Sequence, residues 1–234
     1  MRHACHIDMP IHGVAIALLT LLLAVLAWPR ACWADGEVYD FYENISYVNE
    51  NGVTVTRRVA TVHDRDEFYD YCDHHNDHSG WLALSFCYLT DYYAAMHLGP
   101  LADASGSVHI IIDGDCECLY LEVYKVENWF FYGDNLHITN QGHSVGIGAS
   151  KSINLYNKKL VFSSKNGPLV GLRAPTINIG GCEIDMRVQS AGIVASQSLV
   201  IKNRGEVASQ VVVRDGGDAH PASAAIEGPT TLRI

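Results

Sequence analysis

Aliphatic and polar residues alternate in short segments through the C-terminal half of the chain, and the segments resemble one another. Each holds a pair of small residues, an aliphatic residue, a corner rich in Ala, Gly, Ser or Pro, and a three-residue alternating strand. These segments begin at Val145, Val170, Ala191 and Ala224. Successive starts lie 25, 21 and 33 residues apart, and the longest interval contains a polar loop at residues 214–220. Residues 108–112 and 136–138 are weaker members of the same pattern.

This pattern predicts an all-β chain built as a parallel β-solenoid. Alternation with a period of two places aliphatic side chains on one face of a strand. Strands of three residues cannot bury a core alone, but strands stacked at about 4.8 Å bury a continuous aliphatic column. A β-sandwich would need longer strands joined by hairpin turns. A leucine-rich repeat would need its Leu and Asn signature, which these segments lack.

The N-terminus carries an uncharged apolar run at residues 13–28. A membrane span needs about 20 residues, whereas this run has the length of a signal-peptide core. We predict a signal peptide at residues 1–34, cleaved after Ala34, and therefore a secreted or cell-surface protein. An uncleaved anchor and a lipoprotein acylated at Cys32 are the alternatives. The remaining chain divides into a cap or lead-in region at 35–105 and solenoid repeats at 106–234, which we expect to be incomplete at the C-terminus.

The predicted cap region begins with a hairpin. Residues 49–52 read as a turn between two alternating segments, and such a hairpin would cover the N-terminal edge of the solenoid. We further expect short helices at 64–73 and 94–101, and a strand at 81–89 that enters the stack.

The charge of the chain narrows the choice of partner. Its 234 residues hold 16 Lys and Arg against 26 Asp and Glu, a formal net charge of −10. Nucleic acids and anionic lipids both attract basic surfaces, so neither is an expected partner. No cofactor-binding fingerprint is present, and no cofactor is predicted.

Cysteine usage is compatible with export. Removal of the signal leaves five cysteines, so at least one has no partner within the chain. Cys72–Cys87 is the disulfide to test first. Cys116 and Cys118 lie on the same side of one strand and are not expected to bond each other. Cys182 is expected to be a small buried side chain.

The repeats resemble a known group of proteins. Residues 170–205, together with the strands near Val53, Trp81, Val108 and Leu136, are similar to carbohydrate-binding-domain and adhesin-like parallel β-helix surface proteins of bacteria. The resemblance covers about residues 45–234. Residues 91–106 depart from it as an insertion, and the chain has no terminal sorting signal. What the resemblance implies is a surface or secreted binding role rather than a reaction.

Three polar clusters are candidates for chemistry. His74 and His78 have the spacing of a zinc pair on a helix, although residues 72–78 also read as a solvated loop. The carboxylates of residues 113–115 and 215–218 suggest calcium, or else corners and loops of the solenoid. Glu183 and Asp185 share a face of one strand, as a glycosidase pair would, but surface strands commonly carry such pairs. We assign no catalytic and no metal-binding residue.

Aromatic residues supply the candidate binding surface. Aromatic rings stack on sugars and on partner side chains. Residues 129–132 are four aromatics in a row, which places rings on both faces of a strand. The ligand-binding candidates are Tyr124, Trp129 and Phe131. The alternative is that these rings fill the first turns of the solenoid.

The sequence thus predicts a secreted or cell-surface, adhesin-like binding module without catalysis. The expected partner is a glycan or a host or matrix surface protein, with no nucleic acid and no membrane span after signal cleavage. A polysaccharide-active β-helix enzyme, either lyase or glycosidase, and a structural stalk are the alternatives.

Overall fold

The computed structural model describes residues 42–64, 67, 71, 80–84, 103, 105–118, 121–122, 126–139, 145–162, 170–215, 224–228 and 231–233. All of them belong to the compact unit Phe41–Ile234. The predicted signal at 1–34, the helices expected at 64–73 and 94–101 and the insertion at 91–106 lie wholly or mostly outside the described residues.

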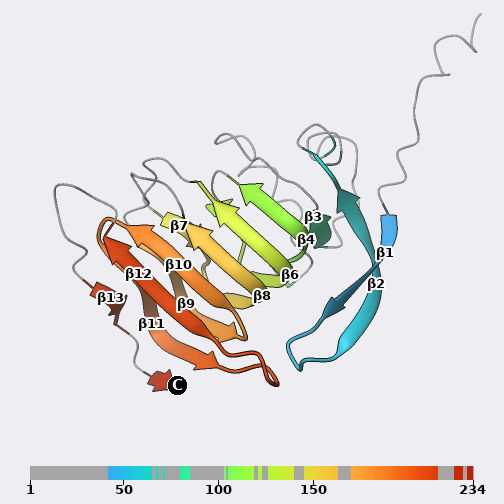
Figure 1. Cartoon of the computed structure of the whole chain (residues 1–234). Coiled ribbons are helices and arrows are strands. Elements are labelled where there is room, and N and C mark those ends of the chain that lie inside the picture. Colours follow the sequence, from blue (N-terminus) through green and yellow to red (C-terminus); the bar gives the residue numbers. More distant parts are fainter. Residues whose placement is uncertain are drawn as a thin grey trace, which may run out of the picture. The chain divides into compact units, whose positions relative to one another are not determined.

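The described part of the chain is a stack of β-strands (Figure 1). The strands are β1 (Tyr42–Val48), β2 (Thr54–Val62), β3 (Trp81–Leu84), β4 (Ser107–Cys118), β5 (Leu121–Glu122), β6 (Asn128–Ile138), β7 (Val145–Gly148), β8 (Ser152–Phe162), β9 (Val170–Gly180), β10 (Glu183–Val188), β11 (Ala191–Lys202), β12 (Gln210–Asp215), β13 (Ala224–Glu227) and β14 (Thr231–Arg233). Apart from the β1–β2 hairpin, every pairing between them is parallel. The predicted parallel β-solenoid is confirmed.

The register divides the stack into three sheets. The first sheet contains β3, the N-terminal halves of β4, β6 and β8, the C-terminal halves of β9 and β11, and β14. The second sheet contains the C-terminal halves of β4, β6 and β8 with β10 and β12. The third sheet contains β5, β7, the N-terminal halves of β9 and β11, and β13.

A glycine makes one of the corners between the first and second sheets. Gly133 has a φ of +89°, and a Cβ atom there would lie 2.1 Å from the carbonyl oxygen of Ile112. Only glycine combines this φ with such a close approach of the neighbouring strand. The bend lets a single strand, β6, contribute to both sheets.

The repeats align in space as the sequence predicted. Val145 pairs with Val170, Val170 with Ala191, and Ala191 with Ala224. The weaker members need one correction. Residues 108–112 belong to the first sheet, but residues 136–138 pair with residues 160–162 in the second. Residues 129–131 take the place opposite the strand at 153–155, so the aromatic run, rather than 136–138, continues the column of short strands.

Apolar side chains stack along the interior from turn to turn. One column of the first sheet is fully buried and runs through Val108, Trp129, Ile153, Ile177 and Leu199. Stacking such residues removes a continuous apolar strip from water, which is the main stabilising contribution in a solenoid.

Two cysteines also lie in this interior. The thiols of Cys116 and Cys182 are buried and form no disulfide. Burial raises the pKa of the Cys182 thiol to about 12, so this residue is the small buried side chain that the sequence predicted. Cys72 and Cys87 lie outside the described residues, and so does the side chain of Cys118. The Cys72–Cys87 disulfide therefore stays a prediction.

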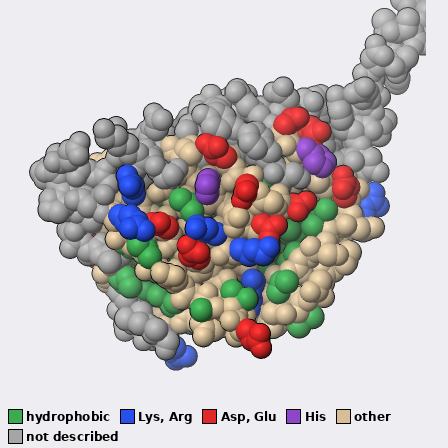
Figure 2. Space-filling view, viewed as in Figure 1, with side chains coloured by type: hydrophobic (Ala, Val, Ile, Leu, Met, Phe, Trp, Pro, Cys, Tyr) green, Lys and Arg blue, Asp and Glu red, His purple; other side chains and the backbone are tan. Residues whose placement is uncertain are grey.

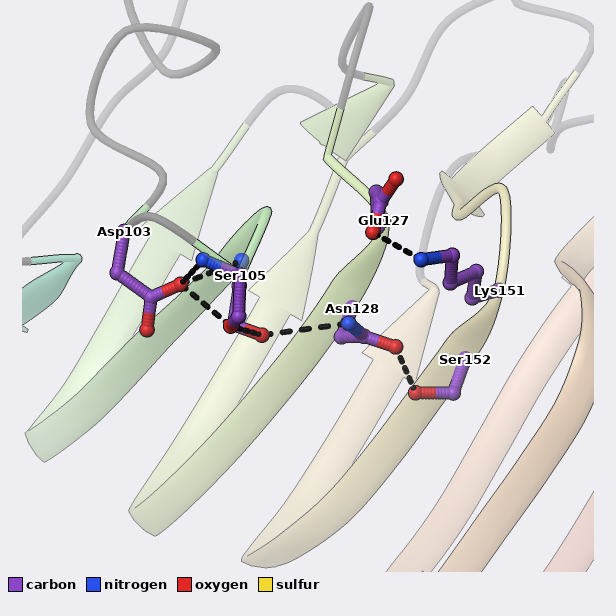
Figure 3. A network of polar contacts seen from close by, with 7 residues as sticks. Asp103, Ser105, Glu127, Asn128, Lys151 and Ser152 are labelled. Atoms are coloured by element: carbon purple, nitrogen blue, oxygen red, sulfur yellow. Dashed lines mark hydrogen bonds and ion pairs between the residues drawn. The ribbon is translucent and has the colours of Figure 1, made fainter.

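A polar column holds the first-sheet strands in register on their outer side (Figure 3). The carboxylate of Asp103 accepts hydrogen bonds from the Ser105 hydroxyl and from the Ser107 N–H. The Ser107 hydroxyl accepts from the Asn128 amide, and the Ser152 hydroxyl donates to the same Asn128 side chain. The neighbouring column continues it, since the Asn178 amide donates to Asn154 Oδ1 at 2.7 Å. The bonds of Asp103 are local, whereas those from Ser107 to Asn128, from Asn128 to Ser152 and from Asn154 to Asn178 each join one turn to the next, which favours in-register stacking.

The predicted turn at residues 49–52 is confirmed. The Asn49 side chain accepts hydrogen bonds from the backbone N–H groups of Asn51 and Val53, and Gly52 adopts a φ of +79°. The turn joins β1 to β2 in an antiparallel hairpin, and β2 continues into the stack through parallel pairing of residues 60–62 with β3.

Candidate ligand-binding cleft

Two of the three predicted ligand-binding residues lie in the core. Trp129 and Phe131 have exposed fractions of 0%, and the Trp129 indole donates a hydrogen bond to the carbonyl oxygen of Gly148. A ligand in solvent does not reach side chains in that position, so we assign both to the packing of the solenoid interior. Tyr124 lies outside the described residues.

The opposite face of the same strands carries a second set of rings. Trp81, His109 and Phe130 occupy matching positions on β3, β4 and β6. Their rings are stacked nearly parallel: the centroids of Trp81 and His109 lie 3.9 Å apart, and those of His109 and Phe130 lie 4.4 Å apart. The strand spacing of a parallel sheet, about 4.8 Å, is what brings equivalent side chains into this contact.

The Arg57 guanidinium closes the stack at its β2 end. Its Cζ lies 3.9 Å from the centroid of the Trp81 ring, a cation–π contact. Trp81 is therefore covered by Arg57 and by His109, and His109 is covered by Trp81 and Phe130. These rings present their edges, rather than free faces, to a ligand.

The β1–β2 hairpin packs over the outer face of the first sheet. Tyr47 of β1 contacts Tyr132 of β6 with ring centroids 4.9 Å apart. The hairpin contributes Ile45, Tyr47, Val55 and Val59 to a small apolar cluster, and the sheet contributes Trp81, Ala83, Ile111, Phe130, Tyr132 and Tyr156. The sequence predicted that the hairpin would cap the edge of the solenoid. It also crosses the face of the solenoid.

A single arginine holds the far end of the hairpin. Arg204, in the turn between β11 and β12, donates a hydrogen bond from Nη1 to the carbonyl oxygen of Val48 at 3.4 Å. The hairpin is thus joined to the solenoid at β3 and again at the turn after β11.

A cleft of about 560 Å³ lies between β2 and the aromatic stack. We call it the hairpin cleft. Its lining combines rings, two charges and polar groups: Tyr47, Asn49, Glu50, Val55, Thr56, Arg57, Trp81, His109, Phe130 and Tyr132. Volume and lining are those of sites that bind small or extended ligands, in which apolar walls are combined with a few placed polar groups. A second hollow of about 190 Å³ follows β1 on the other side of the hairpin.

The histidine in the stack is held neutral. Burial lowers the pKa of His109 to about 4, with a further lowering by Arg57, against the opposite effects of Asp103 and Glu50. Its buried Nδ1 atom makes no hydrogen bond with a described group. Burial also raises the pKa values of Tyr132 and Tyr156. At neutral pH the floor of the hairpin cleft is therefore uncharged, and its charges are Glu50 and Arg57 from the hairpin.

The candidate carboxylate pair occurs on another surface. Glu183 and Asp185 lie on β10 in the second sheet, where Lys159 approaches Glu183 at 2.9 Å and Arg214 binds Asp185 through two hydrogen bonds. The bond from Arg214 lowers the pKa of Asp185, which is the opposite of what a general acid needs. Figure 2 shows acidic and basic side chains interspersed on the face in view.

The candidate calcium and zinc sites lie at a corner of the solenoid or outside the described residues. Asp113 and Asp115 flank Gly114 at the corner between the first two sheets, where Asn135 donates to Asp115. The residues at 72–78 and at 216–218 are not among those described. Within the described ranges, no three His, Cys, Asp or Glu side chains are grouped to hold a metal ion.

The repeat pattern of the sequence did not identify the aromatic stack, although an alignment of three strands indicates it. Aligning the strand at 81–84 with 109–112 and 130–133 places Trp81, His109 and Phe130 at one position. The strands are separated by segments of unequal length, so the repeat spacing alone does not produce this alignment.

Comparisons with known proteins identified no relative of this chain. No family model, no curated protein and no solved structure matches the chain. The resemblance to bacterial β-helix surface proteins therefore stays a prediction. Among the helical segments that the structure describes, none has the length and apolar character needed to cross a bilayer.

Proposed function

We propose that this chain is a secreted or cell-surface binding module of the adhesin-like type, without catalysis, and that it binds its ligand in the hairpin cleft. The ligand belongs to one of the two classes expected from the sequence, a glycan or a surface protein of a host or matrix. Secretion is supported by the apolar run at residues 13–28.

The observation that carries the proposal is the hairpin cleft itself. About 560 Å³ of open volume lies beside a rigid sheet, and ring edges line it together with Asn49, Thr56 and the charges of Glu50 and Arg57. The hairpin that forms one wall is anchored at both ends. A preformed site of this kind loses little conformational entropy when a ligand binds.

The two alternatives are less well supported. The glycosidase form of the enzyme alternative needs a carboxyl group that stays protonated, whereas Arg214 lowers the pKa of Asp185 and Glu183 is ion-paired with Lys159. A structural stalk needs no cleft, and the hairpin cleft has no evident use in one.

Binding to an array of immobilised glycans and matrix proteins tests the proposal. The exported chain should bind a small set of targets saturably, and Arg57→Ala should weaken that binding at least tenfold. Arg187→Ala removes a similar exposed charge from the second sheet and is the matched control, with unchanged binding expected. A folded chain that binds nothing, or that binds equally well after Arg57→Ala, would overturn the proposal.

A further inference from the structure

On one edge of β2, no strand that the structure describes pairs with the residues beside the hairpin cleft. At the turn, the Asn49 N–H donates to the Val53 carbonyl oxygen, which makes these two residues a hydrogen-bonded pair. Bonded and non-bonded pairs alternate in an antiparallel ladder, so the next bonded pair is Tyr47 with Val55. The backbone groups of Thr54 and Thr56 therefore point away from β1.

The side of β2 that these groups face borders the hairpin cleft at Thr56. Val55, Thr56 and Arg57 line the hairpin cleft, and β3 pairs with β2 only from Ala60 onward. Within the part of the chain that the structure describes, no strand occupies this side of Thr54 and Thr56. The opposite edge of the hairpin differs, because Arg204 satisfies the Val48 carbonyl there.

We infer that the ligand is an extended peptide segment of a partner protein, which adds as a strand to the open edge of β2. The inference rests on the proposed function and specifies its ligand class. Alternate residues of a strand present N–H and C=O groups about 6.8 Å apart, and a polypeptide backbone matches that spacing. An exposed strand edge is a template for such pairing. A sugar would instead seek ring faces, and those of Trp81 and His109 are covered.

The side chains around the edge indicate what the peptide carries. Arg57 lies over the Trp81 ring and forms no ion pair with a described residue, so it is complementary to an acidic side chain of the peptide. Near the tip of the hairpin the turn residues Asn49, Glu50 and Asn51 are polar, and Val53 beside them is 56% exposed. Two further valines, Val48 and Val207, are 37% and 50% exposed.

Val48 and Val207 lie at the opposite edge, where Arg204 bonds the Val48 carbonyl and pairs with Val207, so Val53, directly before β2, is the exposed valine on the side of the peptide. Four residues of extended chain separate Val53 from Arg57, or about 13 Å. The peptide expected to fit best therefore has an aliphatic residue and an acidic residue about four positions apart.

A phage library of random ten-residue peptides tests this inference on the exported chain. The expected result is selection of peptides with that spacing, which then bind as synthetic peptides in fluorescence polarisation. Arg57→Glu should shift the selection toward basic residues. Thr56→Pro should weaken binding at least tenfold, because it removes an edge N–H that β1 does not use. Ser46→Pro is the matched control: Ser46 lies opposite Thr56 in a non-bonded pair, so this change removes an N–H from the other edge of the hairpin, and the peptide should bind normally.

Hydrogen exchange keeps the test decisive if Thr56→Pro does not fold. In the unaltered chain, a bound peptide should protect the amide hydrogens of Thr54 and Thr56. Peptide binding that leaves both amides unprotected would overturn strand addition. Binding to glycans with no peptide selected would overturn this inference and leave the proposed function standing, whereas a folded chain that binds neither would overturn both.

Discussion

The two faces of β6 are equally aromatic, but they are packed by different parts of the chain. Trp129 and Phe131 point inward, are 0% exposed, and contact residues of the neighbouring turns. Phe130 and Tyr132 point outward and contact His109 and the hairpin residue Tyr47. The inner face is built by the repeat itself, whereas the outer face depends on an element that the repeat does not contain.

This difference has an energetic consequence. Removing an inner ring leaves a cavity in a column that continues above and below, and the strands cannot collapse into it without losing register. Removing an outer ring leaves a gap beside the hairpin cleft, which water already enters. Equal truncations on the two faces should therefore have unequal costs.

The largest expected effect comes from paired truncations on β6. Phe131→Ala should lower the free energy of unfolding by about 4 kcal/mol, and Phe130→Ala by only about 1 kcal/mol, since Phe130 is partly exposed. Urea denaturation followed by circular dichroism measures both. Equal losses of unfolding free energy would mean that the hairpin packs against Phe130 as closely as the neighbouring turns pack against Phe131.

The same difference explains which parts of the structure could be predicted. Alternation along the strands identifies the inward residues, and the repeat starts at Val145, Val170 and Ala191 are in register as expected. The turn at 49–52 could be recognised from its own residues. The position of the hairpin over the first sheet could not, because the contact of Tyr47 with Tyr132 joins segments that share no periodicity. The hairpin cleft exists only through that contact, so its lining was not predicted.

Lowering the pH should have a smaller effect on the free energy of unfolding, through His109 on the outer face of the first sheet. The folded-state pKa of His109 is about 4, below the value near 6.5 of an unfolded chain, because burial disfavours the charged ring. The stability that the neutral ring contributes is fully present above pH 6.5 and is lost as the pH falls toward 4. The loss should reach at most about 3 kcal/mol in the free energy of unfolding.

Urea denaturation at a series of pH values measures this loss, with His109→Phe as the control. Phenylalanine preserves a ring between Trp81 and Phe130 but does not titrate, so the variant should lose less stability between pH 6.5 and 4. The charges facing His109 are Asp103, Glu50 and Arg57, and they remain in the variant. Identical pH profiles for the two proteins would assign the acid sensitivity to other groups.

The smallest effect is expected on the outer face of the second sheet, which lies beyond the hairpin cleft. Asp185 and Arg214 form a two-bond ion pair there, but both side chains are solvated, with exposed fractions of 33% and 53%. The attraction between exposed charges is screened by water and salt, and ordering two long side chains offsets what remains. Arg214→Leu should therefore leave the urea midpoint unchanged at 0.15 M salt, even though the pair has good geometry. If Arg214→Leu instead costs as much as Phe130→Ala, the uncovered outer face stabilises the solenoid as much as the covered one. The special role of the hairpin would then lie in forming the cleft rather than in holding the sheet.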